Sequence, residues 1–107
     1  MSTQETGGGP PATTTAGGGP EAAASVNGFG TGLSLLGCTV ARLAQGTYRI
    51  TLTTPRDETD SVMTLSGQSV LYIGAALHNT SSLIDIAFAD ISGNAQDVGF
   101  DFALFVV

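Results

Sequence analysis

Lysine is absent from this 107-residue chain, and cysteine and histidine occur once each, as Cys38 and His78. Without lysine there is no P-loop, whose lysine contacts phosphates, and no Schiff-base chemistry. A single cysteine excludes an intrachain disulfide. Cys38 and His78 alone are too few for a structural zinc site, which ordinarily has four ligands. We therefore expect no metal and no cofactor.

Positive charge is scarce as well. Arg42, Arg49 and Arg56 stand against nine acidic residues, and the formal net charge is −6. Nucleic-acid binding depends on basic side chains that neutralise phosphates, so the sequence predicts no nucleic-acid partner. Charged residues make up only 11% of the chain, less than half of the usual share of about 25%. This low content favours association with other protein surfaces.

Long hydrophobic runs are also missing. No stretch approaches the 18 or more apolar residues that a membrane-spanning helix requires, so no membrane partner is expected. The N-terminus has no basic region followed by an apolar stretch, which a secretory signal would show. Synthesis in a cytoplasm is the resulting expectation.

Residues 1–28 have the composition of a flexible arm. They contain no aromatic residue and three of the four prolines, and the quartet GGGP occurs at 7–10 and again at 17–20. Such a segment buries too little apolar surface to offset its ordering entropy, so we expect it to be disordered alone and to order on a partner. Fully extended it reaches roughly 90 Å. The residues predicted to bind the partner are Pro10, Pro11, Pro20 and Val26.

Residues 29–107 have the pattern of a single all-β domain. Thr47–Thr53 alternates with Tyr48, Ile50 and Leu52 on one face, which is typical of a half-buried strand. Gln45-Gly46 predicts a hairpin turn to the segment 38–44, in which Cys38 is expected to be buried. Further strands are predicted at 62–66, 69–77, 81–90 and 98–107. Six or seven short strands without helical periodicity indicate an antiparallel β-sandwich of jelly-roll type.

Two predicted strands carry apolar residues on both faces. The segment 69–77 is apolar on both faces, which suggests a central strand or one covered by a partner chain. In 98–107, Phe100, Phe102, Leu104 and Val106 form one face, and Phe105 and Val107 lie on the other. A domain of about 79 residues is marginal alone and often relies on oligomerisation. We therefore predict a homo-oligomer interface; the alternative is that Phe105 and Val107 are ordinary core. The predicted interface residues are Leu71, Ile73, Leu77, Phe105 and Val107.

Candidate catalytic groups are few. His78 could act as a base oriented by Asp85, with Ser66, Ser81 or Ser82 as the nucleophile, but no nucleophile-elbow motif is present. The glycine-rich segment 28–32 has neither a preceding strand nor a lysine, so it is predicted to be a hinge between arm and domain. We expect the protein not to be an enzyme.

Two acidic loops are candidate cation sites. Asp90–Asp97 places oxygen donors around a central glycine, but it lacks the closing bidentate glutamate of a calcium loop. The other loop contains Asp57, Glu58 and Asp60. In both cases we favour a solvated turn, with cation binding left open.

The stretch VARLAQGTYRITLTTP (40–55) resembles a pattern of tailed-bacteriophage virion proteins, in which a Thr-rich strand leads into a Thr-Pro loop. The closing segment 84–107 resembles the last hairpin of the same β-sandwich modules. Such modules occur at the ends of fibres and among capsid decoration proteins, and similar ones assemble as trimers.

The resemblance implies a non-enzymatic virion structural protein at the particle surface. We expect a trimeric capsid decoration (cement) or short head-fibre protein, attached through its arm to the major capsid protein or another virion protein. The alternative is a tail-fibre-type receptor-binding module that recognises a host surface glycan through loops 54–61, 78–82 and 92–97.

Overall fold

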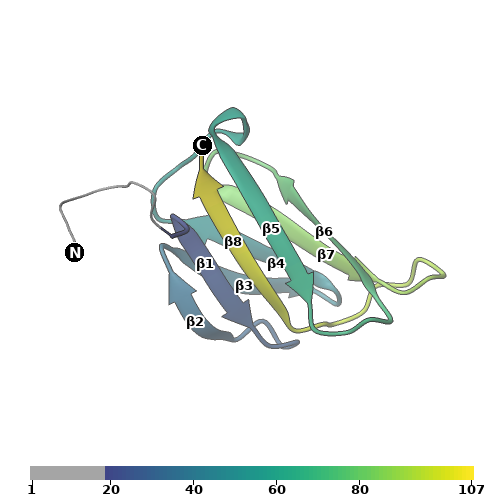
Figure 1. The fold of residues 1–107 in the computed structure, drawn as a ribbon. Coiled ribbons are helices and arrows are strands. Elements are labelled where there is room, and N and C mark those ends of the chain that lie inside the picture. Colours follow the sequence, from purple (N-terminus) through teal and green to yellow (C-terminus); the bar gives the residue numbers. More distant parts are fainter. Residues whose placement is uncertain (1–18) are drawn as a thin grey trace.

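The fold is a β-sandwich of two four-stranded antiparallel sheets, seen in a computed structural model that describes residues 19–107 (Figure 1). The all-β sandwich prediction is therefore confirmed. Sheet A has the order β2-β1-β8-β5, and sheet B has the order β3-β4-β7-β6. The strands are β1 (Ala22–Val26), β2 (Gly32–Leu36), β3 (Cys38–Ala44), β4 (Thr47–Leu52), β5 (Ser61–Gly67), β6 (Ile73–His78), β7 (Leu83–Ala89) and β8 (Phe100–Val106), with one 3₁₀ turn, η1 (Glu58–Asp60).

The core lies between the sheets and is built from side chains that alternate along each strand. In β4, β7 and β8 every second residue is buried, as the period-two pattern predicted, except that Val106 at the end of β8 is exposed. Three aromatic rings meet at its centre, those of Tyr48, Phe88 and Phe100, with centroids 5.1 to 6.4 Å apart. Cys38 is buried as expected, and burial raises the pKa of its thiol.

The boundary predicted at residue 28 is wrong, because β1 lies inside the sandwich. β1 is a central strand of sheet A, paired with β2 on one side and β8 on the other. Its inward residues Ala22, Ala24 and Val26 belong to the core. Val26 is therefore a core residue and not part of an arm. Pro20 lies just before the strand and is half-buried, whereas Pro10 and Pro11 lie outside the described residues.

Two further expectations are corrected. The glycine-rich segment 28–32 is not a hinge between arm and domain; it lies at the β1–β2 connection and runs into β2. There the Asn27 side chain accepts hydrogen bonds from the backbone N–H groups of Phe29 and Thr31. Of the two alternatives for the apolar stretch 69–77, the central strand is wrong, because β6 is an edge strand of sheet B; cover by a partner chain stays a prediction.

The sandwich has two ends with different loops. The chain enters β1 at the end where β8 finishes, and the Glu21 N–H donates to the Leu104 carbonyl. Loops 53–60 and 79–82 meet at this end through the Arg56–Ser81 backbone hydrogen bond. Loops 27–31, 45–46 and 90–99 lie at the other end. In residues 19–107 no helix has the length and apolar character needed to cross a membrane.

Candidate assembly surfaces

The outer face of sheet A is organised in rows that cross the sheet. One row is Leu36–Ala23–Ala103–Thr64, and the next is Ser34–Ser25–Asp101–Ser66, as the pairing register places them. Phe105 and Val62 are paired nearer the end where β8 finishes. The face is therefore apolar toward that end and weakly polar toward the other.

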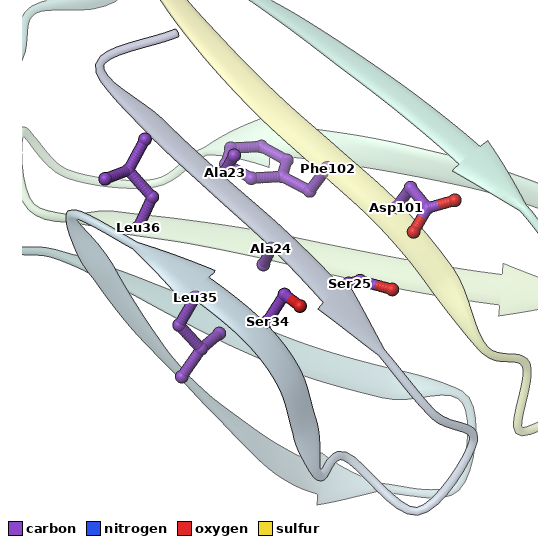
Figure 2. A pocket seen from close by; sticks show the side chains of 8 residues that line it. All are labelled: Ala23, Ala24, Ser25, Ser34, Leu35, Leu36, Asp101 and Phe102. Carbon is purple, nitrogen blue, oxygen red and sulfur yellow. The ribbon is translucent and has the colours of Figure 1, made fainter.

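A shallow hollow of about 310 Å³ lies over β1 on this face. Figure 2 shows Leu36 of β2 and Asp101 of β8 bordering it, with the small side chains of Ala23 and Ser25 between them. Small residues on the central strand leave this space because they reach less far from the sheet than leucine. Ser34, Ala24, Leu35 and Phe102 complete the lining.

The outer face of sheet B is different because an ion pair lies on it. Arg49 and Asp85 are directly opposite in the β4–β7 register, and the Arg49 Nε donates to Asp85 Oδ1 at 2.8 Å. The Arg49 guanidinium lowers the pKa of the Asp85 carboxyl through this hydrogen bond. Ile73 and Leu77 of β6 lie on the same outer face and are largely exposed.

The predicted interface residues do not form one surface. In β8 the side chains of Phe102 and Leu104 face the core, and Phe105 lies on the other face of the strand, so it points outward from sheet A. Ile73 and Leu77 point outward from sheet B, on the opposite side of the sandwich. All five predicted residues are exposed, including Leu71 in the loop before β6 and Val107 at the end of the described chain.

The sequence reasoning missed a cluster of hydrogen bonds around Asp97, which we call the Asp97 cluster; it joins Asp97 to Arg42, Gly46 and Tyr48. The Asp97 carboxylate accepts from Arg42 Nη2 at 2.9 Å and from the Gly46 N–H at 2.7 Å. The Tyr48 hydroxyl lies 3.2 Å from Asp97 Oδ1 and donates to the Gly28 carbonyl at 2.8 Å. The hydrogen bond from Arg42 is the main cause that lowers the pKa of Asp97. This cluster ties loop 90–97 to the β3–β4 turn, and its residues lie far apart in the sequence.

In the loop Asp90–Asp97 the Asp90 carboxylate holds the loop's own backbone. Asp90 Oδ1 accepts from the N–H groups of Ser92 and Asn94, both at 2.9 Å. The hydrogen bond from Asn94 is the first cause that lowers the pKa of Asp90. In loop 57–60, Asp57 Oδ1 accepts from the Thr59 N–H. Within residues 19–107 no group of three or more His, Cys, Asp or Glu side chains is arranged to hold a metal ion.

His78 and Asp85 do not come together as the catalytic alternative required. His78 is paired with Ile84 and faces the interior, whereas Asp85 faces outward and binds Arg49 and Asn79. Both ring nitrogens of His78 are inaccessible and have no hydrogen-bond partner in the described part of the chain. This region instead borders a polar pocket of about 260 Å³, lined by Arg56, Asp57, Glu58, His78, Asn79, Thr80 and Ser81.

All three arginines of the chain form ion pairs within the described residues. Arg42 pairs with Asp97, Arg49 with Asp85, and Arg56 with Glu21. Each guanidinium is therefore already neutralised by a carboxylate.

Comparison with protein-family models, with curated proteins and with solved structures finds no match for this chain.

Proposed function

We propose that this chain is a non-enzymatic structural protein of a tailed-phage particle, a capsid decoration or short head-fibre protein. Copies of the domain associate, as trimers, and the N-terminal segment attaches them to the major capsid protein or a neighbouring virion protein. The observation that carries the proposal is the combination of a Gly/Pro-rich N-terminal segment with a sandwich whose outer faces carry large exposed apolar side chains.

The exposed apolar residues support association. Leu36, Val62, Ile73, Leu77 and Phe105 are large side chains on the outer faces of strands rather than in the core. A monomeric soluble protein rarely leaves such groups together on a face, and they commonly mark contacts with other proteins. Within residues 19–107 each arginine is paired with a carboxylate, so none is left unpaired to bind phosphates.

The attachment step is tested by removing residues 2–18 and measuring co-sedimentation with particles that lack the protein. This truncation keeps β1, whereas a truncation through residue 26 also removes Ala22, Ala24 and Val26 from the core. We expect the shorter truncation to stay folded and to lose particle binding. Retained binding at wild-type level would contradict attachment through the N-terminal segment.

A second candidate function is recognition of a host glycan, favoured by the polar pocket. Two of the three loops proposed for this role, 54–61 and 78–82, meet in it and supply charged, amide and hydroxyl groups. The third loop, 92–97, lies at the opposite end of the sandwich, so it belongs to no common site with them. Sugar hydroxyls are suitable partners for such groups.

A glycan array with the wild-type chain and an Asn79→Ala, Glu58→Ala double variant tests this candidate. Binding that the double variant loses would favour receptor recognition. An array without hits favours the structural role.

A further inference from the structure

We propose, building on the self-association in the proposed function, that copies of this chain meet through the outer face of sheet A. The occupant of this face is a second copy of the chain, and in a trimer the three A faces surround the symmetry axis. The outer face of sheet B takes no part in the contact.

The charge distribution is the first argument. The four strands of sheet A contain one charged residue, Asp101, whereas sheet B contains Arg42, Arg49 and Asp85. No charged residue occurs from Ala22 through Ala41, which includes all of β1 and β2. Copies that each carry a net charge of −6 repel one another. Burying the outer face of sheet B would also take the Arg49–Asp85 ion pair out of water, which carries a desolvation cost, and interface cores are depleted of charged residues.

The shape of the face is the second argument. Ala23 and Ala103 are neighbours in the row that begins with Leu36, and they keep the middle of the face low. The hollow over β1 has room for an aliphatic side chain of a neighbouring copy, such as its Leu36. Phe105 and Val62, paired across β8 and β5, add a second apolar contact on the same face.

The position of the chain ends is the third argument. β1 begins beside the end of β8, and the Val107 N–H donates to the Asp60 carbonyl at the same end of the sandwich. Copies related by rotation about an axis along sheet A would therefore send their N-terminal segments from one end of the assembly. Several segments on one assembly raise the effective concentration for a second attachment after the first.

The test compares two double variants of the full chain that change the net charge equally. Leu36→Lys with Val62→Lys modifies the A face, where these side chains are 54% and 51% exposed. Ile73→Lys with Leu77→Lys modifies the B face, where they are 71% and 67% exposed. Sedimentation equilibrium gives the native mass over a range of concentrations, and circular dichroism verifies that each variant is folded.

We expect the wild type and the B-face variant to be oligomers of the same mass, and the dissociation constant of the A-face variant to rise about tenfold or more. An A-face variant that associates like the wild type, or a B-face variant that dissociates, overturns this inference and leaves self-association intact. A monomeric wild type overturns both the inference and the self-association in the proposed function.

Discussion

Replacing Tyr48 with phenylalanine tests whether the core depends on the hydroxyl at its edge. The side chain is fully buried, and its hydroxyl accepts from the Val98 N–H at 3.1 Å while donating to the Gly28 carbonyl. Phenylalanine keeps the ring contacts with Phe88 and Phe100 but leaves the buried Val98 N–H without this partner. An unsatisfied buried group costs about 1–3 kcal/mol. We expect a loss of that size in the free energy of unfolding.

Urea denaturation at one low protein concentration measures this loss, because association would otherwise add to the apparent stability. For a domain below 100 residues the same loss lowers Tm by roughly 5–20 °C. Tyr72→Phe is the control, since Tyr72 packs only at the margin of the core and belongs to no part of the Asp97 cluster. A change at Tyr48 below about 0.5 kcal/mol, the range of ordinary surface substitutions, would refute the assigned role of the hydroxyl.

Three further predictions concern the sheets. Asp85→Asn removes a carboxyl whose pKa is lowered in the folded state, so it should destabilise the protein at neutral pH; the difference from wild type should vanish in acid denaturation as pH falls through the folded pKa. Gly74→Ala places a methyl group against the Phe88 ring and should cost about 1–3 kcal/mol in thermal unfolding, whereas Gly19→Ala meets no neighbour and should be neutral. Asp101→Asn removes the one charge on the strands of sheet A, so sedimentation equilibrium should give a lower dissociation constant; a higher one would contradict the assigned contact face.

The period-two alternation determined which side chains are buried in β4, in β7 and from Phe100 to Leu104 of β8. In β4, Tyr48, Ile50 and Leu52 face the core, and in β7 the outward position of Asp85 followed from the same pattern. The turn at Gly46 was also predictable, because glycine readily adopts the positive φ that such a turn requires. In the structure Gly46 has a φ of 73°. These features depend on neighbours along the chain, which the sequence displays directly.

β1 could not be found from composition averaged over residues 1–28, because alanine is a weak strand former. Its local signal was the alternation of Ala22, Ala24 and Val26 with Ala23 and Ser25. Only the pairing with β2 and β8 makes this segment a central strand, with Ala22, Ala24 and Val26 in the core.

The composition and alternation of the sequence determined an all-β sandwich with little charge and an apolar surplus beyond its core. The tertiary structure alone decided that β6 lies at an edge, that Asp97 reaches Tyr48, and that Phe105 and Leu77 point to opposite sides. Alternation fixes the two faces of a strand relative to its own backbone. Which face meets solvent, a partner or the opposite sheet depends on strand order, and strand order is set by contacts between segments distant in the chain.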